Sequence, residues 1–363
     1  MSDDIPISVR RRHAPNKPSD KPYRQQQLKS IRFHLTITKV LPIAVLGGLI
    51  LVGAGTALFF VSNNSLETSI DYTDCITENG TSAKDIINFS YPDGATKCVF
   101  EIELTDEYKG DVKFFYGLTG FYQNYRLYML SRNDYQLLGD LNSTDECGPL
   151  SFELSGDGTS LPIVPCGFIA NSFFNDTFKL YYHPADNDTE TVRVPFSTNG
   201  IISNTEKKRK FKNPPYNRSY TLCDAFANTA KPPWWQKPIC MLGVTDDEED
   251  TSGAGVGLEN VDLMVWMRTA ALPSFRKYYR NLDRESDYFH NGLQKGNYTL
   301  VINYNYNPHT FNGKKMFVIA RESWMGPRNL FLPIVCMVTG SFSILAFLGI
   351  FLCFTIRKKF TKV

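Results

Sequence analysis

Two long apolar runs dominate the hydrophobic pattern of the chain. The first, VLPIAVLGGLILVGAGTALFFV at 40–61, has 22 residues without a charge, and the second, FLPIVCMVTGSFSILAFLGIFLCF, covers 331–354. About 20 helical residues rise roughly 30 Å, the thickness of a bilayer's hydrocarbon core, so both runs are predicted to be transmembrane helices. The first run begins after 39 residues and is much longer than a signal-peptide core of about 7–15 residues, so we interpret it as a retained anchor.

Shorter stretches of alternating polar and apolar residues lie between the two runs. They are KCVFEIEL, VKFFYGL, TFKLYYH, ETVRVPF, NYTLVINYNYN and KKMFVIARE, with Gly, Pro, Asn and Asp between them. Such alternation is typical of strands, and it predicts a mainly-β domain, an antiparallel β-sandwich, across 62–330. Residues 204–240 contain five prolines and no clear period, so we expect a long packed excursion from the sandwich there.

The charges of the two ends predict the orientation of the chain. Residues 1–39 hold nine basic and three acidic side chains, and residues 355–363 hold four basic and no acidic ones. Positive flanks stay in the cytosol, so both tails are predicted to be cytosolic and 62–330 to be extracellular or lumenal. That domain carries 26 basic and 34 acidic residues and is acidic. The basic tails are expected to contact lipid, and no nucleic-acid role is expected, because no basic patch is interleaved with aromatic residues.

The cysteines fit an oxidising compartment. Six of the eight lie in 62–330, and the other two lie in the second apolar run. Six cysteines allow 15 pairings, and closure between sequence neighbours would give three loops of about 20 residues. The six residues predicted to form disulfides are Cys75, Cys98, Cys147, Cys166, Cys223 and Cys240. No CxxC motif occurs, which argues against zinc and redox sites.

Asn-x-Ser/Thr sequons support the predicted orientation, because all of them lie in the region assigned as external. Asn63 is expected to be too close to the membrane to be modified. The predicted glycosylation sites are Asn79, Asn88, Asn142, Asn175, Asn187, Asn217 and Asn297.

Catalytic signatures are missing from the sequence. It contains no HExxH, GxSxG, P-loop or GxGxxG pattern, and only five His residues. The acidic run DDEED at 246–250 lacks the ligand spacing and the turn glycine of a calcium loop, so we interpret it as a solvated loop. We therefore expect no catalytic residues, no metal site and no cofactor.

One stretch, VWMRTAALPSFRKYYR at 265–280, has too many charges for a membrane span and too many aromatic residues for a linker. It is similar to the signature of the cell cycle control protein 50 family, also called transmembrane protein 30. The resemblance continues through YRQQQLKS, VSNNSLETSIDYTDC, GLTGFYQNYRLYMLSRNDYQLLGD at 117–140, PCGFIANSFFNDTF, KFKNPP and YNYNPHTFNGKKMFVIARESWMG.

This resemblance implies a function. Members of the family are β subunits of type-IV P-type ATPases, the phospholipid flippases, and the catalytic α subunit binds ATP and moves the lipid. The chain would then be a non-catalytic partner in a heterodimer, in contact with membrane phospholipids. It would be needed for export of the α subunit from the endoplasmic reticulum, for its stability and for its activity. The implied locations are the endoplasmic reticulum, Golgi, endosomes and plasma membrane.

The cysteine pattern departs from that of the family in two places. The family often has four cysteines before the central block, whereas this chain has only Cys75 and Cys98, so the resemblance implies one local disulfide there instead of two. The bridge between Cys147 and Cys166 lies inside matched sequence. Cys223 and Cys240 lie outside the expected pattern.

Two roles are possible for the aromatic and basic residues of the signature. They could form sandwich core and surface charge, or they could form a rigid docking face for the partner's external loops, since aromatic residues and Arg dominate protein interfaces. The candidate partner-binding residues are Trp266, Arg268, Phe275, Tyr278 and Tyr279.

The apolar runs contain small residues at four-residue spacing, which permit close approach of helices in lipid. These pairs are Ala44 with Gly48, Gly53 with Ala57, and Thr339 with Ser343. A two-span channel subunit is an alternative, and GSFS at 340–343 resembles a small-residue filter, but neither run contains an ionisable residue. An adhesion or cargo receptor is the third alternative.

Overall fold

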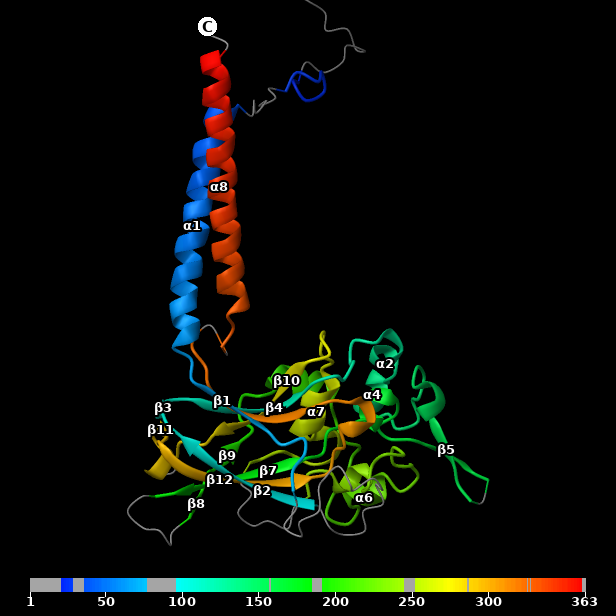
Figure 1. Cartoon of the computed structure of the whole chain (residues 1–363). Coiled ribbons are helices and arrows are strands. Elements are labelled where there is room, and N and C mark those ends of the chain that lie inside the picture. The colour runs from blue at the N-terminus through cyan, green and yellow to red at the C-terminus, as the bar shows by residue number, and fades with distance from the viewer. Residues whose placement is uncertain are drawn as a thin grey trace, which may run out of the picture. The chain divides into compact units, whose positions relative to one another are not determined.

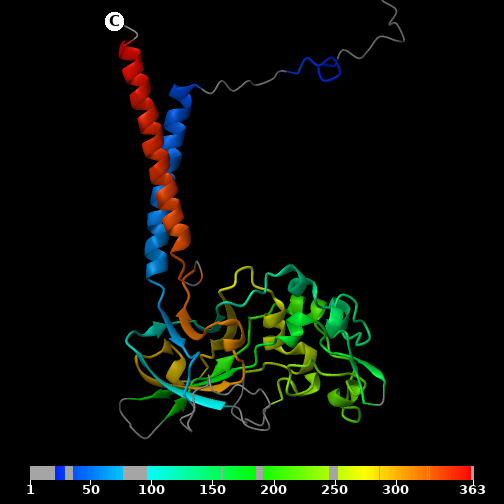
Figure 2. The ribbon, with the colours of Figure 1, turned by 45° about the vertical axis from the view of Figure 1, so that its right-hand side comes forward.

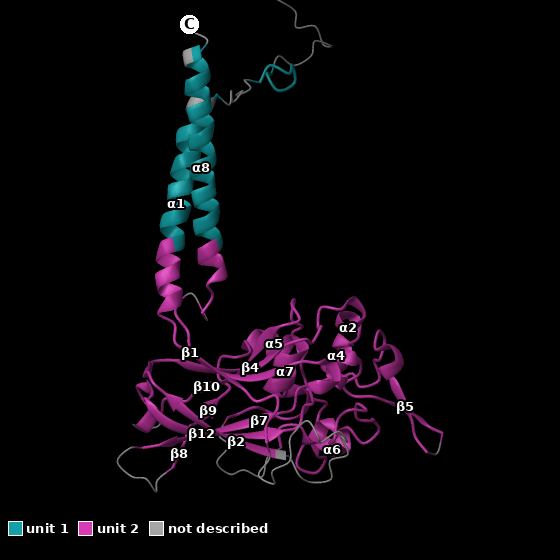
Figure 3. Cartoon of the chain, viewed as in Figure 1, with its two compact units in different colours: residues 1–55, 335–363 teal, residues 56–334 magenta. Residues whose placement is uncertain are grey.

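The computed structural model of the chain (Figure 1) describes 21–28, 36–76, 96–156, 158–184, 191–244, 252–285, 287–324, 326 and 328–360. The acidic run 246–250 and the sequons at Asn79, Asn88 and Asn187 lie outside these residues. The chain divides into two compact units, one formed by 1–55 with 335–363 and the other by 56–334 (Figure 3).

Two long helices form most of the first unit, α1 (Ile37–Asn63) and α8 (Phe331–Phe360). Both are long and apolar enough to cross a membrane, over Lys39–Asn63 and Phe331–Lys358. Glycines allow the two helices to pack closely. A Cβ atom added at Gly48 would lie 3.0 Å from the Gly340 carbonyl oxygen, and a Cβ atom added at Gly340 would lie 2.7 Å from the Gly48 carbonyl oxygen. A larger residue at either position would force the backbones apart.

Two antiparallel sheets form the centre of the second unit. The five-stranded sheet has the order β1 (Glu67–Asp71), β13 (Lys315–Arg321), β4 (Val112–Leu118), β10 (Phe275–Leu282) and β9 (Phe196–Ser197). The four-stranded sheet has the order β2 (Thr96–Leu104), β12 (Gly296–Tyr304), β7 (Thr177–His183) and β8 (Val192–Arg193). Two short pairs accompany them, β3 (Tyr108–Lys109) with β11 (Gly292–Leu293) and β5 (Phe152–Leu154) with β6 (Ser160–Pro162).

The two larger sheets pack face to face, as both ribbon views show (Figures 1 and 2). The rings of Phe178 in β7 and Phe317 in β13 join them, with centroids 4.7 Å apart. Alternation places every second side chain of β12, from Tyr298 to Tyr304, in this core. The predicted mainly-β, antiparallel domain between two apolar helices is confirmed.

Short helices and loops form a layer that packs against the sandwich. The helices are α2 (Arg126–Leu130), α3 (Asp134–Leu137), α4 (Phe168–Asn171), α5 (Asn204–Lys210), α6 (Leu222–Ala225) and α7 (Val261–Met267). We call the described residues of 119–176 and 198–274 together the helical layer. The excursion predicted for 204–240 is thus only one part of a larger irregular region.

All three disulfides join sequence neighbours: Cys75 with Cys98, Cys147 with Cys166, and Cys223 with Cys240. The first connects the segment after β1 to β2, and the other two lie in the helical layer. The remaining cysteines, Cys336 and Cys353, are free and lie in α8.

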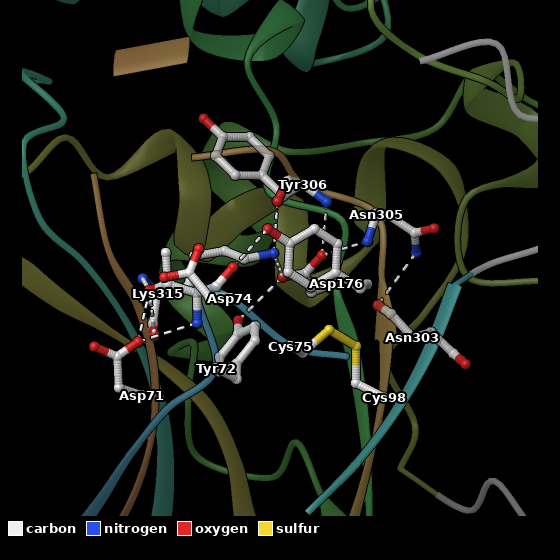
Figure 4. Close-up of a disulfide and its surroundings, with 12 residues drawn as sticks. Asp71, Tyr72, Asp74, Cys75, Cys98, Asp176, Asn303, Asn305, Tyr306 and Lys315 are labelled. Atoms are coloured by element: carbon white, nitrogen blue, oxygen red, sulfur yellow. Dashed lines mark hydrogen bonds and ion pairs between the residues drawn. A yellow bond between two sulfur atoms is a disulfide. The ribbon is translucent and has the colours of Figure 1, made fainter. Parts of the chain in front are cut away.

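A buried ion pair lies at the centre of a polar cluster in the second unit (Figure 4). Lys315 Nζ lies 2.6 Å from Asp176 Oδ2, and neither side chain is exposed. The carboxylate of Asp176 also accepts hydrogen bonds from the Tyr72 hydroxyl and from the N–H groups of Asn305 and Tyr306. Burial lowers the pKa of Lys315 to about 8, although Asp176 opposes the shift. Because Tyr72 follows β1 and Lys315 begins β13, this cluster fixes both strands that lead to the apolar helices.

Candidate functional site

The signature stretch 265–280 has three structural parts. Residues 265–267 end α7, residues 268–274 form a loop, and β10 begins at Phe275. β10 lies between β4 and β9 in the five-stranded sheet, although its sequence does not alternate. The five candidate docking residues therefore have different environments.

Trp266 lies in the interior of the domain and has an exposed fraction of 0%. Its indole N–H donates a hydrogen bond to the Ile169 carbonyl oxygen at 2.7 Å. Four aromatic rings surround it at centroid distances of 5.8 to 6.5 Å, those of Phe121, Phe174, Phe275 and Tyr306. In this conformation the Trp266 side chain is core and has no exposed surface for a partner to contact.

Tyr278 and Tyr279 lie on opposite faces of β10. Tyr279 is 6% exposed, and its hydroxyl accepts a hydrogen bond from the Phe178 N–H. Tyr278 is half-buried, and its ring stacks on Phe115 with centroids 5.0 Å apart. A register shift between Tyr278 and Arg280 buries Arg280 as well, where its guanidinium forms two contacts with the carboxylate of Asp262. Tyr279 is thus also core, whereas Tyr278 keeps part of its surface.

Two cations fix the end of α7. The Lys277 ammonium donates hydrogen bonds to the carbonyl oxygens of Val265, Trp266 and Arg268, which have no partner within the helix. Burial, and then repulsion from Arg268, lowers the pKa of Lys277 to about 7. Arg268 is exposed and pairs with Glu206 of α5, and hydrogen bonds from Arg268 lower the pKa of this carboxyl. The loop that follows Arg268 therefore begins from a fixed point.

Three hydrogen bonds join this loop to the block 117–140. The Phe121 N–H donates to the Pro273 carbonyl oxygen at 3.2 Å, and the Ala270 N–H donates to the side chain of Gln123 at 2.9 Å. The Asn124 amide donates to the Ala271 carbonyl oxygen at 3.0 Å. The loop 268–274 and the segment 121–125 consequently lie side by side.

Large exposed apolar side chains lie in these two segments and in α2, which follows the second of them. These six side chains have exposed fractions between 41% and 67%, and α2 contributes no buried residue. We call Tyr122, Tyr125, Leu127, Met129, Leu130 and Leu272 the apolar surface. Soluble domains rarely expose so many large apolar residues together, and Tyr and Met are enriched in the centres of protein interfaces.

Sequence reasoning missed all six of these residues, although all lie inside the blocks 117–140 and 265–280. The segment YQNYRLYML contains the signal, because it is rich in aromatic and aliphatic residues without the period of a strand or a long helix. Which of its side chains are exposed depends on the packing of Phe121 and Gln123, which local pattern does not reveal.

Four of the predicted glycosylation sites lie among the described residues, and their side chains differ in exposure. Asn142, Asn217 and Asn297 are exposed, and Asn175 is half-buried with its amide bonded to Gln236. Asn63, for which no modification is expected, is exposed at the end of α1.

Among the described residues, no three His, Cys, Asp or Glu side chains lie close enough together to hold a metal ion. A groove of about 790 Å³ has a mixed lining that includes Tyr279, Arg280 and Asp262. These three side chains already take part in core contacts, so the groove offers little free chemistry.

The model of the LEM3 (ligand-effect modulator 3)/CDC50 family matches residues 58–360. The chain belongs to this family. Cell cycle control protein 50A of Mus musculus is 41% identical over 335 residues, which cover 91% of this chain and 86% of the relative. Cell cycle control protein 50B of Homo sapiens is 38% identical over 339 residues, 91% of each chain. ALA-interacting subunit 3 of Arabidopsis thaliana is 31% identical over 349 residues, 95% of this chain and 85% of the relative.

Membership of the CDC50 family confirms the resemblance found in the sequence. It also gives the apolar surface a context, because both segments that form it lie within the matched range 58–360. Its exposed large apolar side chains make the surface a candidate interaction site on the described part of the domain.

Proposed function

We propose that this chain is the non-catalytic accessory (β) subunit of a phospholipid-translocating P-type ATPase, a flippase. The observation that carries the proposal is the CDC50 family match over 58–360. The name of one relative, ALA-interacting subunit 3, is that of a subunit that interacts with ALA. The architecture supports the same role, because it combines two apolar helices with a rigid domain that displays an apolar surface.

In this proposal the apolar surface binds the external loops of the catalytic subunit. These six side chains are 41–67% exposed, so burying their remaining apolar surface, at about 25 cal/mol per Å², contributes favourable free energy that offsets part of the association costs. Arg268, Phe275 and Tyr278 keep some exposure and lie on or next to the same loop, so they can contribute at its border. Trp266 and Tyr279 act indirectly by fixing α7 and β10.

The orientation and cellular role follow from the same proposal. Residues 1–39 and 355–363 lie in the cytosol, and 62–330 lies outside it. The chain stabilises the folded catalytic subunit by mass action, allows its export from the endoplasmic reticulum, and favours one conformation of its cycle. It thereby supports phospholipid movement to the cytosolic leaflet, and so lipid asymmetry, in the Golgi, endosomes and plasma membrane.

The test is affinity isolation of the tagged full-length chain in mild detergent. A P-type ATPase should co-purify, and the complex should show phospholipid-stimulated ATP hydrolysis that the isolated chain lacks. Lipid-stimulated hydrolysis by the chain alone, or isolation without any ATPase, would contradict the proposal. Ion conductance of the purified chain in a planar bilayer would instead favour the channel alternative.

A further inference from the structure

The central strand of the four-stranded sheet carries a glycosylation sequon. β12 contains Asn297, Tyr298 and Thr299, and it pairs along its length with β2 on one side and β7 on the other. Tyr298 is 1% exposed in the core. Thr299 Oγ1 lies 2.6 Å from His183 Nε2 of β7. Only the Asn297 side chain is exposed, so two of the three sequon residues are held by the fold.

Glycan transfer needs the whole sequon. The reaction forms a bond between the Asn amide nitrogen and C1 of the first sugar of a lipid-pyrophosphate-linked oligosaccharide, while the amide loses a proton and the lipid pyrophosphate leaves. The transferase has to bind the acceptor backbone and the Ser/Thr hydroxyl together with the amide. In β12 both backbone edges are already paired and the Thr299 hydroxyl is engaged, so the folded strand is closed to the enzyme.

The sequon at Asn217 offers the opposite case. Asn217, Arg218 and Ser219 are all exposed and belong to no strand or helix. The Asn217 side-chain oxygen accepts hydrogen bonds from the N–H groups of Ser219 and Tyr220, a local turn that can open without disturbing the core. This sequon therefore remains accessible after folding.

The order of synthesis leaves a short time for transfer to Asn297. β2 and β7 precede β12 in the chain, so both neighbours of β12 exist before it is made. The bridge between Cys75 and Cys98 holds β2, and Cys98 lies opposite Ile302 of β12. A ribosome adds about 5–20 residues per second, whereas a hairpin forms in about 1–10 μs, so pairing can follow synthesis closely.

We propose that Asn297 accepts a glycan only before β12 pairs with β2 and β7, so that competition between glycan transfer and sheet closure sets its occupancy, whereas Asn217 stays an acceptor in the folded domain. The inference rests on the external orientation of 62–330 given under Proposed function.

The sequon at Asn175 becomes inaccessible to the transferase only after residues far downstream have been synthesised. Its Thr177 hydroxyl accepts a hydrogen bond from the Asn303 amide, 126 residues downstream, and Asp176 pairs with Lys315. Transfer to Asn175 can therefore continue while most of the intervening chain is made. The structure thus orders the three sites by how long each remains open: Asn217, then Asn175, then Asn297.

The first experiment measures transfer to the folded full chain. The protein is made while assembly of the lipid-linked oligosaccharide is inhibited, checked for a single thermal transition, and incubated with oligosaccharyltransferase and lipid-linked oligosaccharide. Mass spectrometry of each sequon should show Asn217 modified at least ten times faster than Asn297. Equal rates would overturn the inference. If no sequon of the chain carries a glycan even when it is made without the inhibitor, the orientation fails instead.

The second experiment slows sheet closure during synthesis and does not need an unglycosylated folded protein. Full-length chain is translated into microsomes with Thr299→Ser, a weaker acceptor that keeps occupancy below saturation. Adding Ile302→Ala, which removes a buried side chain of β12, should raise Asn297 occupancy at least twofold and leave Asn217 unchanged. The matched control is Val301→Ala, on the outer face of the same strand, which should have a smaller effect. Unchanged Asn297 occupancy with Ile302→Ala would overturn the inference.

Discussion

The sandwich and the helical layer are stabilised in different ways, although one chain forms both. The sandwich uses strands of up to nine residues, regular ladders and alternating side chains. The helical layer uses helices of four to seven residues and depends on single side chains that bond to the backbone. For example, the Trp235 indole donates a hydrogen bond to the Ala170 carbonyl oxygen. The Gln136 side-chain amide likewise donates one to the Ile163 carbonyl oxygen.

This difference explains where the candidate interaction site lies. A sheet face is defined by a repeated pattern, so its outer residues are mostly polar, like Glu101 and Glu103 of β2. The helical layer has no such repeat, and a few anchors such as Trp266 are enough to hold its loops. Apolar side chains that the fold does not need can then remain on its surface, as Leu272 does.

The largest effect is expected from the anchor of the helical layer. Trp266→Ala should lower the free energy of unfolding by about 3–5 kcal/mol, because it leaves a cavity among four aromatic rings and removes the donor to the Ile169 carbonyl. Denaturant unfolding of the full chain in detergent measures the loss. Trp266→Phe fills part of the cavity and should cost less. A loss below about 1 kcal/mol for Trp266→Ala would show that the layer does not depend on this side chain.

A comparable loss is expected when one member of the buried ion pair between Asp176, the last residue of the first helical-layer segment, and Lys315 of β13 in the sandwich is removed. Asp176→Ala leaves the Lys315 ammonium buried without its counter-ion and should cost about 3–5 kcal/mol. The double variant Asp176→Leu with Lys315→Met removes both charges and should be more stable than either single change. Equal losses in the single and double variants would mean that the carboxylate's bonds to the 305–306 backbone, and not the ion pair, stabilise the cluster.

Local pattern was enough to predict the sandwich strands but not the features that distinguish the helical layer. Five of the six alternating stretches form one strand each, because burial of one sheet face imposes a two-residue period on the sequence. The sixth, ETVRVPF, forms only the two-residue strand β8 and the first residue of β9. β10 was not predicted from the sequence, because a bulge and two buried cations, Lys277 and Arg280, interrupt its alternation of polar and apolar residues. The ion pair of Asp176 with Lys315 could not be predicted either, since 139 residues separate its members. The sequence did identify the blocks that carry the apolar surface, but not its exposed residues.

A smaller, pH-dependent effect is expected at the contact between α7 and β10. The pKa of Lys277 is about 7 in the folded protein, against 10.5 for an unperturbed lysine. Between these values the unfolded chain binds more protons, so this group makes the free energy of unfolding rise with pH from about 7 to 10.5. Below pH 7 both states are protonated and the cost of the buried charge is fully present. Lys277→Met should therefore make stability less dependent on pH in this window.

Denaturant unfolding of parent and Lys277→Met at pH 6, 8 and 9.5 measures this contribution. The difference between the two proteins is the quantity to follow, because Lys315 has a pKa lowered to about 8 and contributes a slope of the same sign in both. Parallel stability curves would mean that hydrogen bonds to the carbonyl oxygens at the end of α7 keep Lys277 charged throughout the range.

The smallest effect on stability, and a large one on association, is expected at the apolar surface. Tyr125 and Leu272 are 61% and 67% exposed, so replacing both with Ser should change the free energy of unfolding by no more than about 0.5 kcal/mol per site. If these side chains dock the external loops of the catalytic subunit, the double variant should reduce co-purification of the ATPase severalfold, because it removes apolar area from the centre of the interface. Val99→Ser is the matched control, since Val99 is 46% exposed on the outer face of β2 and lies directly opposite Val301 of β12. The control should keep both stability and association, whereas equal loss of the ATPase in both proteins would mean that association follows general surface hydrophobicity and that the helical layer holds no specific docking site.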